Sequence, residues 1–208
     1  MISAQAALDA LRAGNGRFVS DLRARARESR VRRRELPSAQ HPFAIVLGCS
    51  DARVPAEIVF DQGLGDLFVI RVAGNIVAPS QVGSVEFAAE AFGTRLVVVL
   101  GHSNCGAVQA TLQQLARPSH EQSRNLSSIV NRIRPAVESL LERGASIDLQ
   151  NLEQLAVRAN IRMSAEHLRH GSDVLERLIQ TAGLTVVGAE YSLESGVVDF
   201  FDGVPAGG

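Results

Sequence analysis

Four short runs of consecutive apolar, mostly aliphatic residues divide the chain. They lie at residues 43–48, 66–72, 95–101 and 184–191. Runs that are continuous rather than alternating are typical of parallel strands that are covered on both faces. A fifth run, at residues 196–201, follows a turn-like Leu-Glu-Ser-Gly and is predicted to form an antiparallel edge strand.

Segments with helical periodicity lie between these runs. Apolar residues recur at helical spacing over residues 3–13 behind a serine N-cap, and Gly14 and Gly16 are expected to end that helix. A helix is predicted over residues 80–93, and helical patterns continue through residues 106–181. The alternation predicts an α/β fold, with a mostly parallel central sheet of four parallel strands plus an antiparallel edge strand, flanked by helices.

Length and composition are those of an ordinary globular chain. The 208 residues suit a single domain, with residues 1–39 expected to form an N-terminal helical arm. A content of 46% hydrophobic and 21% charged residues argues against a disordered chain. No stretch is long and apolar enough to span a membrane, and the start does not resemble a signal peptide, so we expect a cytoplasmic protein.

The charge balance argues against a nucleic-acid partner. The formal net charge is -1, and all 21 basic residues are arginine. Proteins that bind nucleic acid by neutralising phosphates usually carry a basic excess. The Arg-rich run at residues 23–34 is therefore interpreted as a solvated arm or a face that packs on a partner subunit, with a patch that binds an anionic surface or nucleic acid as the alternative.

The chain has only two cysteines, which excludes a disulfide-dense scaffold. Cys49 begins Cys-Ser-Asp-Ala-Arg directly after the first apolar run, and Cys105 ends His-Ser-Asn-Cys directly after the third. The carboxyl ends of neighbouring parallel strands meet at one edge of a sheet, so Cys49, His102 and Cys105 are expected to lie together. Zinc takes thiolate and imidazole ligands, and a catalytic zinc keeps a fourth position for water.

Asp51 and Arg53 add a charged pair to this edge. Being two residues apart in an extended segment, they project to the same side. An arginine partner keeps a carboxylate ionised and orients it as a hydrogen-bond acceptor. Beside an open zinc position, such a carboxylate can accept a proton or a hydrogen bond from the bound water, or it can close the site as the fourth ligand. Cys105 precedes a predicted helix, whose first amides are expected to favour its thiolate form.

Each motif also has a less specific interpretation. A buried cysteine after a strand is often only a small hydrophobe, and the two cysteines could form a structural zinc site or a redox thiol pair. Residues 101–105 resemble the nucleophile elbow of serine hydrolases, but Cys105 replaces the last glycine. The Asp51–Arg53 pair favours a catalytic metal, since a structural zinc site is closed by four protein ligands and needs no such carboxylate. His41 is a candidate proton relay.

Taken together, the C-x-D-x-R and H-x-x-C motifs resemble those of the β-class carbonic anhydrase family. The match runs through residues 48–77, 83–90 and 98–108, and more weakly through residues 188–200. The resemblance implies reversible hydration of CO2 to bicarbonate and a proton through a zinc-bound hydroxide. It also implies one zinc per subunit, held by Cys49, His102 and Cys105, and assembly into homodimers or tetramers through N-terminal helices.

The resemblance carries over further roles. Asp51 accepts a hydrogen bond from the hydroxide, and Arg53 holds Asp51. Gln40 corresponds to a donor to substrate oxygen, usually across a dimer interface, and Gly106 lets the backbone approach zinc. The family's narrow apolar substrate pocket corresponds to Phe68, Ala73 and Phe87.

The chain departs from the family pattern in its pocket. Phe87 stands where many members have Tyr, and Ala73 is smaller than the Val common there, so the pocket is expected to be roomier. Relatives on this scaffold hydrolyse carbonyl sulfide or carbon disulfide, which keeps such a hydrolase as an alternative.

A second departure concerns regulation. Some bacterial members close the zinc with the aspartate and bind regulatory bicarbonate through Trp, Arg and Tyr. This chain has no Trp, and Val46 stands at that position, whereas Arg71 and Tyr191 match the other two. We therefore predict a zinc open to water, an Asp51 paired with its arginine, and no regulatory bicarbonate site.

Overall fold

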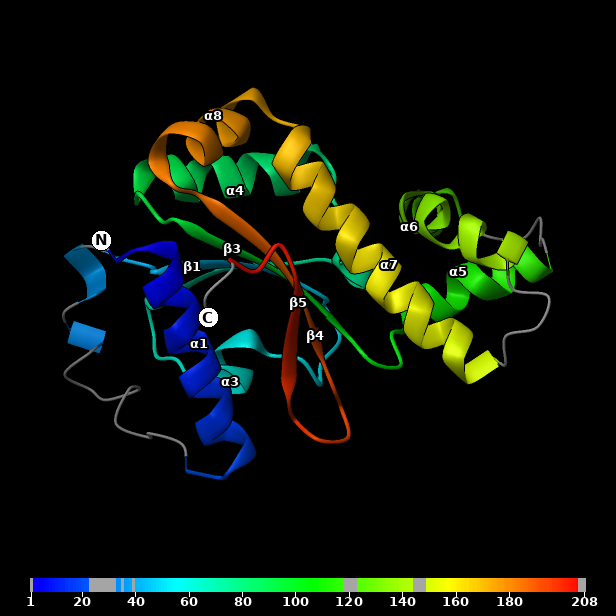
Figure 1. Cartoon of the computed structure of the whole chain (residues 1–208), viewed down its shortest axis with the longest axis horizontal. Helices are drawn as coiled ribbons and strands as arrows, with labels where there is room; N and C mark the ends of the chain where they lie inside the picture. Colours follow the sequence, from blue (N-terminus) through cyan, green and yellow to red (C-terminus); the bar gives the residue numbers. More distant parts are fainter. Residues whose placement is uncertain are drawn as a thin grey trace.

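The computed structural model describes residues 2–22, 33–34, 36–38, 40–117, 123–143 and 149–205. A central five-stranded sheet has the order β2-β1-β3-β4-β5 (Figure 1). Neighbouring strands from β2 to β4 pair in parallel, and β5 pairs with β4 antiparallel, as the sequence predicted. The strands are β1 (Ala44–Gly48), β2 (Leu67–Arg71), β3 (Leu96–His102), β4 (Thr185–Tyr191) and β5 (Val198–Asp202).

Helices cover both faces of this sheet. The helices α4 to α8 lie on one face, and α1 and α3 lie on the other (Figure 1). The predicted α/β class is therefore confirmed. The helical elements are α1 (Ala4–Val19), η2 (Leu36–Ser38), α3 (Ala56–Val59), η3 (Ala73–Asn75), α4 (Pro79–Ala91), α5 (Gly106–Ala116), α6 (Arg124–Arg143), α7 (Leu149–His170) and α8 (Asp173–Ala182).

Burial on both sides explains why the strand runs are continuously apolar. Every residue of β1 and β3 is buried. Ile45 and Val97 belong to the core cluster beneath α4 to α8, whereas Val46 and Val98 belong to the cluster beneath α1 and α3. Successive side chains of a strand point to opposite faces, so a strand between two helical layers needs apolar residues at every position.

The first helix does not end at its glycines, contrary to the prediction. The hydroxyl of Ser3 caps α1 by accepting from the Ala6 amide, but the helix continues through Gly14 and Gly16 to Val19. A Cβ added at Gly14 would lie 1.8 Å from the Phe60 carbonyl oxygen. Gly14 is therefore a point of close helix packing rather than a stop.

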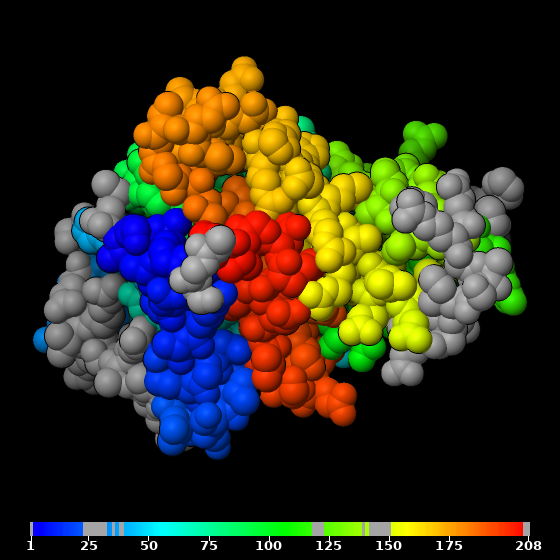
Figure 2. All heavy atoms as spheres, in the orientation of Figure 1, coloured from blue at the N-terminus to red at the C-terminus, as the bar shows by residue number. Residues whose placement is uncertain are grey.

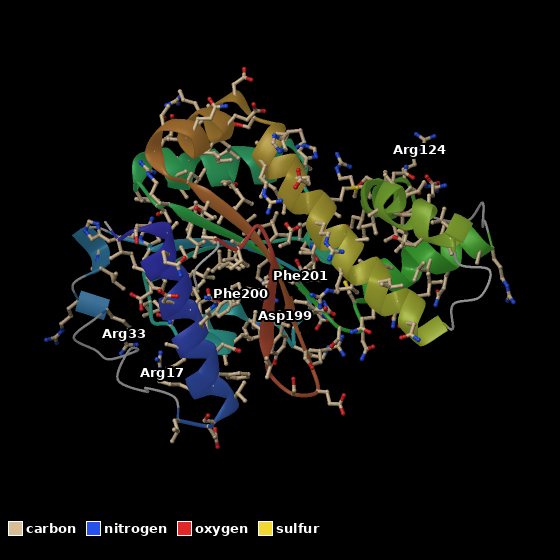
Figure 3. The ribbon with its side chains drawn as sticks, in the orientation of Figure 1. Arg17, Arg33, Arg124, Asp199, Phe200 and Phe201 are labelled. Atoms are coloured by element: carbon tan, nitrogen blue, oxygen red, sulfur yellow. The ribbon has the colours of Figure 1, made fainter. Side chains whose placement is uncertain are left out.

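The edge of the molecule near β5 is held by side chains from both helical layers. Figure 2 shows β5 (red) lying between α1 (blue) and α7 (yellow) on one face of the molecule. Phe200 stacks on Phe60 at a centroid distance of 6.1 Å, and the Arg158 guanidinium of α7 lies 3.8 Å from the centroid of Phe201 (Figure 3). The two neighbouring rings thus fasten β5 to opposite layers.

The remaining predictions about helices have mixed outcomes. The stretch 106–181 forms four helices, α5 to α8, in the described residues. Most of the Arg-rich run at residues 23–34 lies outside the described residues, and its role stays a prediction. Within the described part of the chain, none of the helices is both long and apolar enough to cross a membrane.

Candidate metal centre

The candidate metal ligands come from the ends of two adjacent parallel strands. Cys49 directly follows β1, His102 is the last residue of β3, and Cys105 precedes the first residue of α5. Their ligand atoms all lie within 4.8 Å of one another, and all three residues are buried. Only the strand boundary differs from the prediction, because β3 extends one residue further and includes His102.

The histidine ring is oriented as a metal ligand needs. Nδ1 of His102 lies 2.9 Å from the Ser103 carbonyl oxygen, which makes Nδ1 the protonated donor and leaves a lone pair on Nε2. Nε2 is buried and has no hydrogen-bond partner among the described residues. A buried imidazole nitrogen beside two thiols fits a zinc ion, since zinc takes this combination of nitrogen and sulfur ligands.

The pKa values of the two thiols are shifted in opposite directions. A hydrogen bond from Cys105 lowers the pKa of Cys49 against the opposing effect of burial, and the Gly74 amide, 3.3 Å from Cys49 Sγ, adds to the lowering. The same hydrogen bond, with burial, raises the pKa of Cys105. The first amides of α5 lower the pKa of Cys105, as the sequence predicted, but the hydrogen bond with Cys49 and burial act in the opposite direction and outweigh them.

Asp51 and Arg53 form a two-point ion pair at the border of this group. Arg53 donates from Nε to Oδ1 at 2.9 Å and from Nη2 to Oδ2 at 2.7 Å, and its amide donates to Oδ1 at 3.0 Å. These hydrogen bonds hold the pKa of Asp51 well below its usual range. Oδ2 lies 3.8 Å from Nε2 of His102, so an ionised carboxylate faces the metal ligands.

Arg71 fixes the backbone that carries Cys49 and Asp51. Its Nε donates to the Cys49 carbonyl at 3.0 Å, and its Nη2 donates to the Asp51 carbonyl at 2.7 Å. The side chain that matched a regulatory bicarbonate ligand is thus engaged by main-chain carbonyls of the site loop.

The structure brings together only some of the predicted substrate-pocket residues. The rings of Phe68 and Phe87 lie 6.2 Å apart, and both contact Phe92, which the sequence did not single out. Ala73 adjoins Gly74, whose amide contacts a candidate ligand. A Cβ at Gly106 would meet nothing within 4 Å, so the protein does not crowd that position, and the Gln40 side chain is exposed.

Sequence reasoning missed a set of polar residues behind the ligands. Asn160 donates from Nδ2 to the Gly74 carbonyl at 2.8 Å, and Ser164 donates to the Asn75 carbonyl at 3.1 Å. The contact between Asn160 and Gly74 spans 86 residues of chain, so no local motif reveals it. The only local hint is the sequence Gly74-Asn75 after a strand, which is typical of backbone with positive φ.

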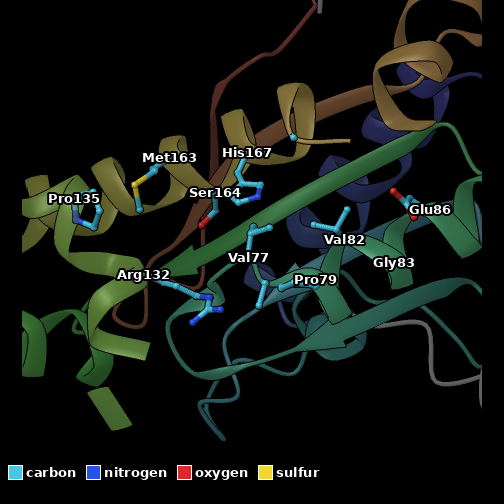
Figure 4. A pocket seen from close by; sticks show the side chains of 12 residues that line it. Val77, Pro79, Val82, Gly83, Glu86, Arg132, Pro135, Met163, Ser164 and His167 are labelled. Carbon is cyan, nitrogen blue, oxygen red and sulfur yellow. The ribbon is translucent and has the colours of Figure 1, made fainter. Parts of the chain in front are cut away.

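The other histidines take no part in the group of ligands. His41, His167 and His170 are exposed, and His120 lies outside the described residues. His167 lines a cavity of about 640 Å³ between α4, α6 and α7 (Figure 4). Val77 and Ser164 also line this cavity, and none of the candidate metal ligands is among its lining residues.

The candidate ligands lie within a region that matches known proteins. A family model described as carbonic anhydrase matches residues 44–198. A carbonic anhydrase of Mycolicibacterium smegmatis is 38% identical over 194 residues, which cover 93% of this chain and 91% of the relative.

Solved structures show the same fold. A β-carbonic anhydrase of Aspergillus fumigatus superposes with a TM-score of 0.76 at 25% identity, covering 97% of this chain and 91% of that chain. One of two β-carbonic anhydrases from Sordaria macrospora, described as tetrameric, superposes with a TM-score of 0.74 at 21% identity and covers 95% of each chain.

Proposed function

The chain belongs to the β-class carbonic anhydrase family, and from that premise we propose that it hydrates CO2 reversibly to bicarbonate and a proton at the Cys49–His102–Cys105 centre. Family membership makes it an enzyme, a carbonate dehydratase, and decides against a structural zinc protein or a redox thiol protein. The observation that carries the assignment of the site is the convergence of three buried ligand atoms within 4.8 Å beside an ionised carboxylate.

We propose that these three residues hold one Zn²⁺ per chain. When bound, zinc supplies a Lewis acid that brings the pKa of water toward neutrality. His102 offers Nε2 because the Ser103 carbonyl engages Nδ1. The pair of thiols offers negative charge to a cation, and the Gly74 amide supports that charge at Cys49.

Asp51 is proposed to orient the water-derived nucleophile. An ionised carboxylate only accepts hydrogen bonds, so Oδ2 takes the O–H of the nucleophile and leaves an oxygen lone pair free to attack the CO2 carbon. Arg53 binds both oxygens of the carboxylate and keeps it ionised, so Asp51 acts only as a hydrogen-bond acceptor. The arrangement supports a site in which Asp51 stays with its arginine and does not become a fourth zinc ligand.

The substrate is proposed to bind against Phe68, Ala73 and Phe87, with Gln40 donating to a substrate oxygen and Gly106 allowing close approach of the backbone. Apolar walls suit the uncharged CO2 molecule better than they suit a charged substrate. The 6.2 Å contact between the Phe68 and Phe87 rings supports part of this pocket.

We also propose that the protein is a homo-oligomer. Phe87 is 56% exposed, beside Phe68 on the edge strand β2. Exposed aromatic side chains of this kind mark interfaces. The tetrameric description of the Sordaria structure supports the same conclusion, without deciding between dimer and tetramer here. A cytoplasmic location and a single domain remain predictions from the sequence.

Metal content and CO2 hydration, measured on three proteins, test the proposal. We expect the wild type to carry one zinc per chain, Cys49→Ser to lose zinc, and Asp51→Ala to keep zinc while its rate falls by about 10²- to 10⁴-fold. If the wild type binds zinc but consumes carbonyl sulfide and does not hydrate CO2, the hydrolase alternative replaces this proposal.

A further inference from the structure

Helix α7 touches the strand that ends in one proposed metal ligand, His102, and the turn that contacts another, Cys49. On the first, Ile161 packs so closely on Gly101 that a Cβ there would lie 2.5 Å from Ile161 Cδ1, and Gly101 immediately precedes His102. On the second, Asn160 and Ser164 bind the carbonyls of η3, whose Gly74 amide reaches Cys49. One helix therefore contacts the backbone beside His102 and the turn beside Cys49.

The η3 turn has a backbone conformation that needs support. Gly74 has φ 71° and Asn75 has φ 43°, two consecutive residues in the left-handed region. Glycine suits this position because of the positive φ of Gly74, and a Cβ there would also crowd the side chains of Ile133 and Ala107. Asn75 adopts this region at an energetic cost, which persists only where the surroundings hold the backbone in place.

Two buried side chains of α7 supply that support. We call Asn160 and Ser164 the α7 clasp. They are one helical turn apart and so share a face. Asn160 binds the Gly74 carbonyl at 2.8 Å and Ser164 binds the Asn75 carbonyl at 3.1 Å. Ser164 projects from α7 toward the segment that carries Val77, directly after η3 (Figure 4).

The opposite side of the same turn faces the metal ligands. The Gly74 N–H donates to Cys49 Sγ at 3.3 Å, while its C=O accepts from Asn160. The Gly74 N–H belongs to the peptide plane directly before the one whose carbonyl Asn160 holds, so the two hydrogen bonds from α7 restrain the position of that amide through φ and ψ of Gly74.

Among the described residues, the Asn160 side chain makes a single hydrogen bond, to the Gly74 carbonyl. Its Oδ1 is buried with no hydrogen-bond partner among the described residues, although the side chain is only 1% exposed. An unpaired buried acceptor is unfavourable, and an apolar side chain of similar size would avoid it, but it would leave the buried Gly74 carbonyl without this donor. The amide hydrogen bond to Gly74 is the feature that such an apolar side chain could not provide.

We propose that Asn160 and Ser164 are positioning residues for the metal centre, which hold the Gly74 amide on Cys49 and thereby set the affinity of the site for its metal. A hydrogen bond to a ligating thiolate withdraws charge from the sulfur and fixes its place, and loss of such an outer contact typically costs about 10- to 100-fold in metal affinity or activity. This inference rests on the proposed use of Cys49 as a metal ligand.

Metal affinity, spectra and apo-protein stability of matched variants test the inference. Asn160→Leu removes the donor to Gly74 at nearly constant volume, and Ser164→Ala removes the donor to Asn75 with little change in packing. Asn15→Leu is the control, because Asn15 is also a buried asparagine that donates to two carbonyls, those of Val59 and Gly196, away from the metal ligands. Zinc affinity is measured by competition with a chromophoric chelator, and the Co²⁺-substituted proteins report the thiolate-to-metal absorption band.

We expect Asn160→Leu to bind zinc at least about tenfold more weakly and to shift the cobalt–thiolate band, with a smaller effect in Ser164→Ala. Asn15→Leu should unfold at a lower temperature yet keep the wild-type affinity and band. Wild-type affinity and spectrum in both clasp variants would overturn the inference, as would equal weakening in Asn15→Leu and Asn160→Leu.

Two further outcomes are also decisive. If apo Asn160→Leu shows no cooperative unfolding, Ser164→Ala decides alone: weakened zinc binding with a shifted band supports the inference, and wild-type behaviour overturns it. If the wild type binds no zinc, the proposed metal centre itself fails, and the inference falls with it. Wild-type zinc binding with unaltered clasp variants refutes only the inference.

Discussion

At the scale of single residues, the site depends on one carboxylate being held at two points. Arg53 is exposed, and an exposed ion pair usually contributes little to stability. Here the guanidinium instead fixes the orientation of Asp51, through hydrogen bonds to both carboxylate oxygens. Its contribution should therefore appear in the rate and not in the free energy of unfolding.

Arg53→Lys tests this distinction. A lysine keeps the charge but cannot make the two-point contact, so we expect the rate of CO2 hydration to fall by about 10- to 100-fold with zinc content and melting temperature unchanged. The measurement is stopped-flow hydration at matched zinc occupancy. Arg177→Lys is the control, since Arg177 pairs with Glu90 on the surface, and it should keep the full rate. A wild-type rate in Arg53→Lys would refute the orienting role.

The sequence revealed the ligands and missed the residues behind them for a physical reason. Cys49, Asp51 and Arg53 lie within five residues of chain after a strand, so their proximity follows from local geometry. Asn160 reaches Gly74 only because α7 packs across β3 and β4, which is a property of the tertiary fold. No pattern along the chain encodes that contact.

At the scale of elements, α1 shows how packing overrides a local rule. Two glycines in a short span predict a helix end, yet α1 passes through both. Gly14 meets the Phe60 carbonyl at a distance that leaves no room for a methyl group, whereas a Cβ at Gly16 would meet nothing within 4 Å. The two glycines should therefore respond oppositely to the same substitution.

Gly14→Ala should destabilise the protein by about 1–3 kcal/mol, as overpacking does in a tight core. Gly16→Ala should stabilise it by about 0.5–1 kcal/mol, because alanine loses less backbone entropy in a helix. Urea unfolding of the two apo proteins gives both values. Equal effects of the same sign would show that the contact between α1 and Phe60 is absent.

The pairing of β4 with α7 predicts a pH-dependent effect. Burial raises the pKa of Glu190, although Arg158 on α7 opposes the shift. A carboxyl with a raised folded-state pKa favours folding most strongly while it is protonated, and that contribution is lost as the pH rises through the folded-state pKa.

Glu190→Gln should therefore gain stability relative to the wild type as the pH rises above the ordinary range of a carboxyl group. The two proteins should converge in free energy of unfolding at lower pH, where Glu190 is protonated in both states. Denaturant unfolding across the acid and neutral range measures the difference. A stability difference that does not vary with pH would show that Glu190 titrates normally.

At the scale of the whole molecule, the α/β architecture was predictable and its boundaries were less so. Burial on both faces forces apolar residues into every position of β1 and β3, and this makes parallel strands visible along the sequence. The edge strand β2 is only partly buried and its aromatic neighbour Phe87 is exposed, which is consistent with the proposed homo-oligomer.

Assembly is therefore the first whole-molecule prediction. Sedimentation should give a mass that is a multiple of 22.2 kDa for the wild type and a smaller mass for Phe87→Glu. Leu126→Glu is the control: Leu126 is 45% exposed on α6, far along the chain from the aromatic cluster, and the mass should stay that of the wild type. A wild-type mass of one chain would contradict the proposed oligomer.

The most direct test of the account is zinc titration of the metal-free protein with CO2 hydration measured at each step. If Cys49, His102 and Cys105 form the reaction centre, the rate should rise in proportion to added zinc and stop rising at one zinc per chain. Metal-free protein should show only the uncatalysed rate. A fully zinc-loaded protein that hydrates CO2 no faster than buffer would contradict the central claim.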